Sequence, residues 1–397
     1  MVVREMQAVL LRLAGSYPVV TVTGPRQSGK TTLCRMAFPD RDYVSLESVD
    51  QRQFATDDPR GFLAQFPKGA VLDEVQRVPD LLSYIQTTVD ERNRSGQYIL
   101  TGSAQFELMD SVSQSLAGRT ALLRLLPFTL EEAYLGRDCP EIDSLLWRGF
   151  YPRIHDHNLN PSEALSFYFD TYVERDLRSL LNVRDLSQFE RFVQLCAGRT
   201  GQILNLTGLG SDCGVTHNTA RAWLSVLETS YLVYLLKPHA RNLGRRLVRS
   251  PKLYFVDVGL ATFLLGVEEP SQLTRHPLRG ALFETFVVSE MLKQRFNRGL
   301  RSNLFFFRDS AGHEVDLLLE SGQAVYLIEI KAGQTVASDF FRGLNFYRSL
   351  NSDSVAGMGV LYGGERCHTR QDTDVFGCRD IPSLYQSSEN ALREKTT

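Results

Sequence analysis

The feature that most constrains this chain is an octapeptide near its N-terminus, Gly24-Pro25-Arg26-Gln27-Ser28-Gly29-Lys30-Thr31. It matches the pattern GxxxxGK[ST], and it stands between an apolar β-type run, Val19 to Thr23, and a helical stretch, Thr32 to Ala37. The glycines permit a loop whose N–H groups point inward, and the start of a helix adds partial positive charge. A chance glycine-rich turn is the alternative. The order of strand, loop and helix favours a phosphate-binding loop.

The loop residue types predict the ligand. Lys30 is expected to bridge the β- and γ-phosphates of ATP, and the Thr31 hydroxyl is expected to coordinate Mg²⁺. The predicted nucleotide contacts are Gly24, Pro25, Arg26, Gln27, Ser28, Gly29, Lys30, Thr31 and Thr32.

Two carboxylates follow another apolar run, Ala70 to Leu72. Asp73 is expected to hold Mg²⁺, and Glu74 is expected to orient and deprotonate the attacking water, which predicts hydrolysis rather than binding alone. By itself, an apolar run that ends in Asp-Glu is commonly a strand entering a solvated loop. The upstream phosphate-binding loop favours the metal-binding interpretation.

Polar residues also follow the β-type run Gln97 to Leu100. Thr101 or Ser103 could contact the γ-phosphate or the water from this position. Arg119, just before the run Ala121 to Leu125, could act as an arginine finger on the nucleotide of a neighbouring subunit. That role predicts a homo-oligomer, and a solvated surface arginine is the alternative.

The bulk composition limits the class of protein. A chain of 397 residues predicts two to four domains. The net charge of -2 gives no overall basic field, so any surface for nucleic acid must be local. Six cysteines without a CxxC pair indicate a reduced compartment and no structural zinc. The N-terminus lacks a signal-peptide pattern, and no apolar run reaches the roughly 18 residues of a membrane span, so we expect a cytoplasmic protein without a membrane partner.

Several stretches together resemble one family. They are GPRQSGKTT, VLDEVQRVPDLL, YILTGS and LAGRTALLRLLPFTLEE in the first third, followed by TARAWLSVLETSYLVYLL, SPKLYFVDVGLA and LFETFVVSEMLK. The chain is similar to a bacterial and archaeal family of AAA-type P-loop ATPases whose C-terminal half is a domain of unknown function (DUF4143). The resemblance covers most of the chain and implies an AAA-type ATPase domain from residue 18 to about 130.

The middle of the chain contains a candidate DNA-recognition helix, Thr216 to Leu227. Its apolar positions predict a buried face made of Ala220, Trp223, Leu224 and Leu227. The opposite face carries polar residues able to contact phosphates or bases, namely His217, Asn218, Arg221 and Ser225. A winged helix fits this pattern, and a helix that only packs in an interdomain joint fits it equally.

A basic segment follows, without any acidic residue among its twelve positions: Arg241, Arg245, Arg246, Arg249 and Lys252. It could contact DNA phosphates. A solvated basic loop, or one paired with acids elsewhere in the chain, explains the charge equally well.

A third cluster lies near the C-terminus. Asp316 begins one β-type run, and Glu329 and Lys331 close the next, so a hairpin would bring them together. Two carboxylates could hold Mg²⁺ or Mn²⁺, while Lys331 stabilises the developing charge on a phosphodiester. The cluster resembles the PD-(D/E)xK nuclease superfamily, with Glu284 at its helical acid, although Glu314-Val315 stands where Pro-Asp would. A solvated hairpin is the alternative.

The expected fold class is therefore α/β, in five parts: a P-loop AAA-type ATPase domain (1–135), a helical lid or connector (136–185), a winged-helix-like domain (186–250), a nuclease-like α/β domain (251–386) and a frayed or helical tail (387–397). The leading functional hypothesis is a DNA-associated ATPase that couples Mg-ATP turnover to the winged-helix and nuclease-like parts. The alternative is an ATP-dependent regulatory switch with an inert nuclease-like domain.

Overall fold

The N-terminal part of the chain folds around a parallel sheet. The computed structural model describes residues 2–103, 115–172, 186–239, 248–370 and 372–396. Five strands in the order β2-β3-β4-β1-β5 form the sheet, and all their pairings are parallel. Their bounds are β1 (Val19–Gly24), β2 (Asp42–Ser45), β3 (Ala70–Asp73), β4 (Tyr98–Ser103) and β5 (Thr120–Arg124). Strands β1, β3, β4 and β5 each overlap a β-type run predicted from the sequence, and the largest difference is at β4, which ends three residues after the predicted Leu100.

Helices cover both faces of this sheet, and every residue of the central strands β1 and β4 is therefore buried. One face packs on α1 (Met6–Ala14) and α2 (Lys30–Ala37), and the other on α4 (Pro59–Ala64) and α5 (Leu81–Arg92). The remaining elements are α3 (Val49–Asp57) and the short 3-10 helix η1 (Val75–Arg77). Since parallel strands end at one edge, Gly24, Asp73 and Ser103 meet there.

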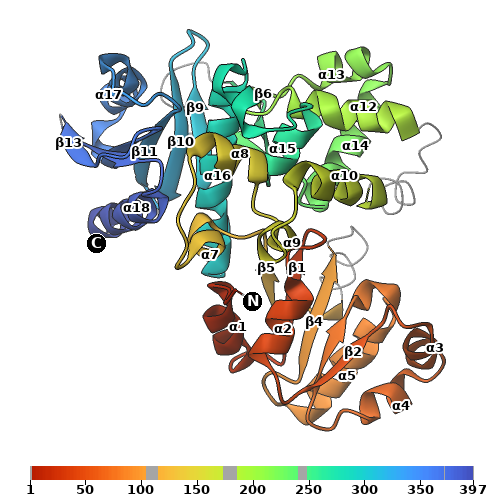
Figure 1. Ribbon diagram of the computed structural model, residues 1–397. Coiled ribbons are helices and arrows are strands. Elements are labelled where there is room, and N and C mark those ends of the chain that lie inside the picture. Colours follow the sequence, from red (N-terminus) through yellow and green to blue (C-terminus); the bar gives the residue numbers. More distant parts are fainter. Residues whose placement is uncertain (1, 104–114, 173–185, 240–247, 371, 397) are drawn as a thin grey trace.

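Four short helices lead from this lobe into the larger one (Figure 1). They are α7 (Leu130–Tyr134), α8 (Ile142–Arg148), α9 (Pro152–Asp156) and α10 (Pro161–Tyr172). A capping box between Thr129 and Glu132 starts α7. Pro152 and Pro161 are the first residues of α9 and α10, where the helix does not use the N–H that proline lacks.

The next segment has the element order α12 (Leu186–Ala197), β6 (Gln202–Ile203), α13 (Leu206–Cys213), α14 (His217–Thr229), β7 (Val233–Pro238) and β8 (Lys252–Phe255). Strand β8 pairs antiparallel with both β6 and β7. Thr216 caps α14 through its hydroxyl, which accepts from the Thr219 N–H at 3.2 Å. The predicted apolar face of α14 is buried, and the Trp223 ring lies 5.2 Å from that of Phe189.

The same sheet continues into the C-terminal part and reaches nine strands, in the order β13-β14-β12-β11-β10-β9-β7-β8-β6. The further strands are β9 (Leu304–Arg308), β10 (Glu314–Ser321), β11 (Ala324–Lys331), β12 (Val355–Tyr362), β13 (His368–Arg370) and β14 (Thr373–Gly377). The helices are α15 (Val258–Leu264), α16 (Arg279–Asn297), α17 (Arg342–Leu350) and α18 (Ile381–Thr396), with 3-10 turns η3 (Pro270–Arg275), η4 (Ser338–Phe341) and η5 (Ser352–Ser354).

Alternation along β10 and β11 separates two cores. Leu318 and Leu327 pack against α17, whereas Leu317, Leu319 and Ile328 belong to the core that contains α16 and α18. Strands β9, β10 and β11 are joined antiparallel, and β12 returns parallel to β11 through α17.

Three comparisons with the sequence-based expectations concern the C-terminal half. Strands β13 and β14 were not predicted. The predicted tail lies within α18, whose Ser388 and Leu392 are buried against the sheet, so the helical alternative is the one observed. The predicted boundary at residue 250 falls between β7 and β8, which pair with each other, so the regions on either side of it share one sheet.

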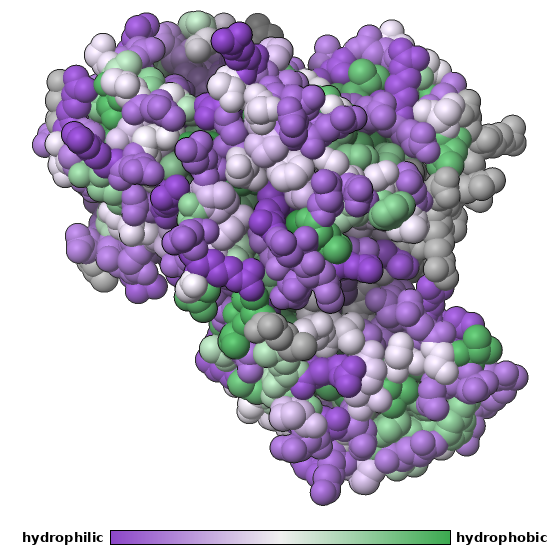
Figure 2. Space-filling model, in the orientation of Figure 1, coloured by the Kyte–Doolittle hydropathy of each residue, from purple (hydrophilic) through white to green (hydrophobic). Residues whose placement is uncertain are grey.

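The surface of the face in Figure 2 is mostly hydrophilic over both lobes, with hydrophobic residues in small groups. Within the described ranges, no helix has both the length and the apolar character needed to cross a membrane.

Candidate functional site

The predicted phosphate-binding loop joins β1 to α2, as the sequence indicated. Gly24 and Gly29 have φ angles of 151° and 90°, which residues with a side chain rarely adopt. A Cβ on Gly24 would lie 2.0 Å from the Leu125 carbonyl oxygen, so only glycine fits between β1 and β5. Gln27 also has a positive φ, 60°. The backbone of this loop is therefore tightly curved, as a loop that wraps an anion must be.

Lys30 is buried at the base of the loop, with 6% of its surface exposed. Its Nζ donates to the carbonyl oxygens of Gly24 at 3.0 Å and Pro25 at 2.8 Å. Burial lowers the pKa of Lys30 to about 8, while Glu74 and Asp73 act in the opposite direction. A phosphate would stabilise this desolvated ammonium more strongly than two neutral carbonyls do.

Asp73, at the end of β3, is surrounded by hydroxyl groups. Its Oδ2 accepts from Thr31 Oγ1 at 2.9 Å and from the Tyr43 hydroxyl at 2.7 Å. Its Oδ1 accepts from Thr101. Thr101 thus contacts the carboxylate in this structure, and its contact with the γ-phosphate or the water stays a prediction. A carboxylate beside a threonine hydroxyl supplies the hard oxygen ligands that Mg²⁺ prefers, so this pair fits a magnesium ion.

Glu74 has a left-handed backbone, with φ 57° and ψ 45°, a conformation that costs on the order of 1–3 kcal/mol outside glycine. Gln76 donates to its carboxylate and also to Ser103 Oγ, the latter at 3.0 Å. Burial raises the pKa of Glu74, and the nearby Lys30 lowers it. A carboxylate with a raised pKa is a stronger base, as the predicted role requires. The contribution of Gln76 was not anticipated from the sequence.

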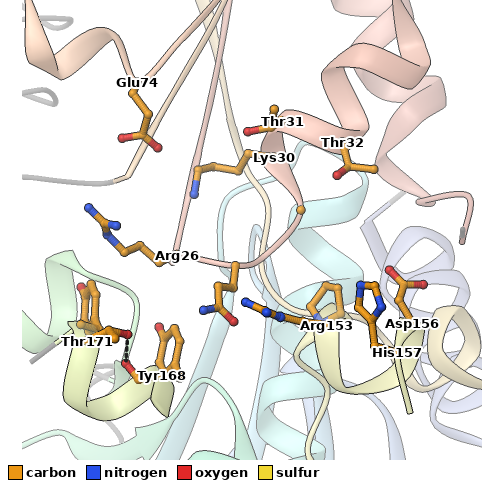
Figure 3. A pocket seen from close by; sticks show the side chains of 14 residues that line it. Arg26, Lys30, Thr31, Thr32, Glu74, Arg153, Asp156, His157, Tyr168 and Thr171 are labelled. Atoms are coloured by element: carbon orange, nitrogen blue, oxygen red, sulfur yellow. Dashed lines mark hydrogen bonds between the residues drawn. The ribbon is translucent and has the colours of Figure 1, made fainter. Parts of the chain in front are cut away.

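A cavity of about 400 Å³ opens over the loop. Figure 3 shows Arg26, Lys30, Thr31, Thr32 and Glu74 on its loop side. The facing wall comes from α9 and α10 and their surroundings: Pro152, Arg153, Asp156, His157, Tyr168, Thr171 and Tyr172. Sequence reasoning missed this wall, because neither spacing nor motif relates these residues to a loop more than 100 positions earlier.

Arg119 lies far from this cavity. It precedes β5 at the end of the sheet opposite to Gly24, since Val19 pairs with Thr120 and β1 runs parallel to β5. Its guanidinium makes two contacts with the Asp90 carboxylate, at 2.6 Å and 2.8 Å. Arg119 therefore does not reach the loop of its own chain, and its predicted action on a neighbouring subunit stays a prediction.

The C-terminal hairpin brings Asp316, Glu329 and Lys331 together, as predicted. Lys331 Nζ lies 3.1 Å from Asp316 Oδ2 and 2.6 Å from Glu329 Oε1, and Asp316 Oδ2 also accepts from the Ile330 N–H at 2.9 Å. Burial and repulsion by Asp316 raise the pKa of Glu329 to about 8. Lys331 thus already balances part of the negative charge.

A second lysine serves the neighbouring acids. Lys252 is 3% exposed, and its Nζ lies 2.9 Å from Glu284 and 2.5 Å from Glu314. The Tyr254 hydroxyl donates to Glu284 at 2.5 Å. The interpretation of Lys252 as a phosphate contact is therefore wrong, because a buried ammonium held by two carboxylates cannot meet DNA. Among the described residues, no group of three or more His, Cys, Asp or Glu is arranged to hold a metal ion.

The remaining candidate DNA contacts lie on the surface or outside the described ranges. On α14, His217, Asn218 and Arg221 are exposed, and Ser225 is partly exposed. Arg249 is exposed as well. Arg241, Arg245 and Arg246 lie outside the described residues.

Three family models match successive parts of the chain. Family models match as an AAA domain over residues 16–134, as a domain of unknown function (DUF8612) over 139–271 and as a domain of unknown function (DUF4143) over 279–381. Uncharacterized proteins of Mycobacterium tuberculosis and Mycobacterium bovis are each 32% identical over 382 residues, covering 94% of this chain and 82% of theirs.

Solved structures give weaker likenesses. A Walker-type ATPase of Pyrococcus abyssi matches with a TM-score of 0.45 and 16% identity, covering 66% of this chain and 94% of that one. DnaA from Aquifex aeolicus, bound to AMPPCP, matches with a TM-score of 0.31 and 16% identity, covering 56% and 86%. The AAA domain therefore rests on the family model and on the loop, strands and carboxylates described above.

Proposed function

Since the chain belongs to the same family as these two mycobacterial proteins and carries an AAA-type P-loop domain, we propose that it is a Mg²⁺-dependent ATP hydrolase that acts in association with DNA. The observation that carries the ATPase part is the contact of Thr31 with Asp73, 2.9 Å apart, next to a half-buried Glu74. Metal ligand, metal-binding acid and base thus meet at one edge of the sheet.

The roles follow from the contacts. Thr31 and Asp73 would hold Mg²⁺, which would supply positive charge that neutralises the phosphates. Lys30 leaves the carbonyls of Gly24 and Pro25 and pairs with the phosphates, because a charge-assisted hydrogen bond is roughly twice as strong as a neutral one. Glu74, oriented by Gln76, accepts the proton of the attacking water.

Coupling to the rest of the chain is supported by the composition of the cavity. Arg153 and Tyr168 belong to the part that matches the second family model, yet they line the same 400 Å³ cavity as Lys30 and Thr31. A nucleotide in this cavity touches both lobes. Binding and hydrolysis then change the contact between them.

The ATPase proposal is tested by two substitutions with different expected results. Lys30→Ala removes the charge that meets the phosphates and should abolish measurable Mg-ATP binding in a calorimetric titration. Glu74→Gln keeps Asp73 and the shape of the site, so ATP should still bind while turnover falls on the order of 10²- to 10⁴-fold. Rapid turnover by Glu74→Gln would exclude the proposed base.

Association with DNA is supported by element order. The element order α12, β6, α13, α14, β7, β8, with β8 between β6 and β7, fits the winged helix that we propose, and α14 exposes His217, Asn218 and Arg221. In the C-terminal part, Lys331 contacts Asp316 on β10 and Glu329 on β11, and Lys252 contacts Glu284 on α16. Burial and repulsion by Asp316 raise the pKa of both glutamates.

The nuclease hypothesis needs its own test. Purified protein is incubated with single-stranded, duplex and branched DNA, with Mg²⁺ or Mn²⁺ and with or without ATP. Asp316→Ala and Glu329→Ala should remove any cleavage and leave DNA-free ATP hydrolysis within about twofold of wild type, because both carboxylates lie in a different lobe from Lys30.

A second candidate is favoured by the lysines of the C-terminal cluster. Lys252 and Lys331 together contact all four acids there, which leaves little uncompensated negative charge to attract a metal ion. On this view the protein is an ATP-dependent regulatory switch, and its nuclease-like part is inert. A wild-type protein that hydrolyses ATP, cleaves no form of DNA and binds no Mn²⁺ at this cluster would favour the switch.

A further inference from the structure

A buried arginine outside the loop contacts the loop directly. Arg4 precedes α1 and is 5% exposed. Its Nη1 donates to the carbonyl oxygen of Ser28 at 2.7 Å, in the middle of the phosphate-binding loop. Arg4 also precedes residue 16, where the match to the AAA domain begins. Neither the motif nor the family match assigns it a role.

This contact fixes the direction of one peptide group. In a trans peptide the C=O and the following N–H point in opposite directions. The Ser28 carbonyl points to Arg4, so the N–H of Gly29 points to the other side. Gly29 lines the cavity over the loop. The arginine therefore turns one N–H donor toward the position of the phosphates.

The contact with Arg4 restricts the backbone at Gly29, a residue that is otherwise conformationally free. Its φ of 90° and ψ of 22° are accessible to glycine at little cost, but glycine also has many other conformations of similar energy. Without a partner for the Ser28 carbonyl, the peptide between Ser28 and Gly29 can rotate. Rotation would replace an N–H donor by a carbonyl oxygen, which repels phosphate. Restricting this freedom before binding strengthens binding.

The other donors of Arg4 hold the segment where the chain leaves the sheet. Nη2 donates to the carbonyls of Leu126 at 2.8 Å and Pro127 at 3.3 Å, and Nε lies 2.9 Å from Glu132 Oε1. The guanidinium also lies 4.9 Å from the centre of the Phe128 ring. One planar cation thus joins the loop to residues 126–132.

Helix α16 holds the same segment from the other lobe. Glu290 accepts from the Leu130 N–H at 2.8 Å, and Lys293 donates to the Phe128 carbonyl at 2.8 Å. These side chains are buried, and the same helix carries Glu284 of the C-terminal cluster. Residues 126–132 are therefore held by hydrogen bonds from both lobes, and Arg4 connects them to the loop at Ser28.

We infer that Arg4 is a positioning residue for nucleotide binding, which orients the peptide between Ser28 and Gly29 toward the phosphates and ties the loop to residues 126–132. The inference rests on the proposed ATPase function. The ligand is the phosphate chain of a nucleoside di- or triphosphate. Arginine is needed because its planar fork serves several acceptors at once, whereas a lysine ammonium is a point charge on a flexible stem.

The test compares Arg4→Lys with Arg12→Lys, a matched change at an exposed arginine of α1. The dissociation constant for Mg-ADP is measured by calorimetry, and KM and kcat are measured for Mg-ATP. Arg4→Lys should raise the dissociation constant and KM about tenfold with kcat within about twofold of wild type. Arg12→Lys should change neither.

If Arg4 only stabilises the fold, the opposite effects on kcat and KM are expected. Loss of folded protein lowers the apparent kcat and leaves KM unchanged, because the remaining molecules are normal. That result, or a folded Arg4→Lys with wild-type KM, would overturn the inference. If Arg4→Lys does not fold, Arg4→Gln, which keeps one donor for Ser28, is measured in the same way. A wild-type protein that binds no Mg-ADP would instead remove the proposed ATPase function on which the inference rests.

Discussion

The two charged sites of this protein differ in how their charges are balanced. At the loop, the carboxylate of Asp73 accepts from the hydroxyls of Thr31, Tyr43 and Thr101, and the ammonium of Lys30 is held by two carbonyl oxygens. In the C-terminal cluster, Lys252 and Lys331 are paired directly with carboxylates.

This difference has a physical consequence. The partners of Lys30 and Asp73 at the loop site are neutral, so neither charge is cancelled by an opposite charge. Binding of a metal ion by Asp73 and of a phosphate chain by Lys30 therefore does not require an ion pair to be broken. In the C-terminal cluster a metal ion must compete with two ammonium groups that are already in place. The same residue types, Asp, Glu and Lys, thus form one site that is prepared for a ligand and another that is stable without one.

The largest expected effect tests the loop site at Arg119, which we predict to supply one more positive charge to the nucleotide of a second subunit. An arginine finger stabilises the transition state and is worth roughly 10³ to 10⁵ in rate. Arg119→Ala should therefore lower ATP hydrolysis by about that factor while Mg-ATP affinity stays nearly constant. Asp90→Asn is the control, because it removes the partner of Arg119 within the chain and keeps the arginine.

The readout is the rate of phosphate release over a range of protein concentrations and in mixtures of variant and wild type. A rate per subunit that does not depend on concentration, or Arg119→Ala subunits that never inhibit wild-type ones, would rule out action between subunits. The loop site would then be complete within one chain.

Removal of one lysine from each site sharpens the comparison. Lys252→Met leaves Glu284 and Glu314 without their shared cation, and breaking a buried ion pair costs about 3–5 kcal/mol. Lys30→Met removes a desolvated charge that only carbonyls accept, so it should cost little stability and abolish nucleotide binding. Urea unfolding of the C-terminal lobe and Mg-ADP titration measure the two effects. Equal loss of stability in both variants would contradict the proposed difference.

The sequence allowed much of the loop site to be predicted, because its residues are close in sequence or end neighbouring strands. Lys30 and Thr31 belong to one octapeptide, and Asp73 and Thr101 each follow an apolar run that becomes a strand of the same parallel sheet. The order of strand, loop and helix fixes their positions before any long-range packing is considered.

The rest of that site could not be predicted, because it depends on contacts across the chain. Arg153 and Tyr168 reach the cavity only because α9 and α10 dock beside the loop. Lys252 shows the same limitation at the other site. Its sequence neighbours are basic, which suggested an exposed segment, but the pairing of β8 with β7 and the packing of α16 bury it against Glu284 and Glu314.

A pH experiment tests the wall of the nucleotide cavity. His155 lies on α9, is buried, and its Nε2 is 2.8 Å from the Gly149 carbonyl. Burial lowers its pKa from 6.5 to about 4. Between these values the unfolded chain binds more protons than the folded one. The free energy of unfolding therefore has its full value above pH 6.5, the pKa of His155 in the unfolded chain. It decreases as the pH falls from 6.5 toward 4.

At about pH 5 the expected loss is about 2 kcal/mol relative to neutral pH, from the linkage of these two pKa values. His155→Gln does not titrate, so its stability should fall less over the same range. The difference between the two proteins in urea unfolding at both pH values gives the effect. Parallel curves for wild type and His155→Gln would mean that this histidine does not control the docking of α9.

The smallest expected effect concerns the proposed DNA surface. Arg221 on α14 and Arg249 are exposed, whereas Lys252 is buried in an ion pair. Each lysine or arginine that neutralises a phosphate contributes about 0.9 to the slope of log affinity against log salt. Arg221→Ala and Arg249→Ala should each reduce that slope by about 1 and weaken binding to all DNA sequences similarly. Arg12→Ala, with the same charge change on α1 in the other lobe, should leave it unchanged. Duplex binding measured by fluorescence anisotropy at several salt concentrations provides the slopes. If Arg12→Ala lowers the slope as much as Arg221→Ala, binding depends on the overall charge of the protein. That result would contradict the proposal that α14 faces DNA.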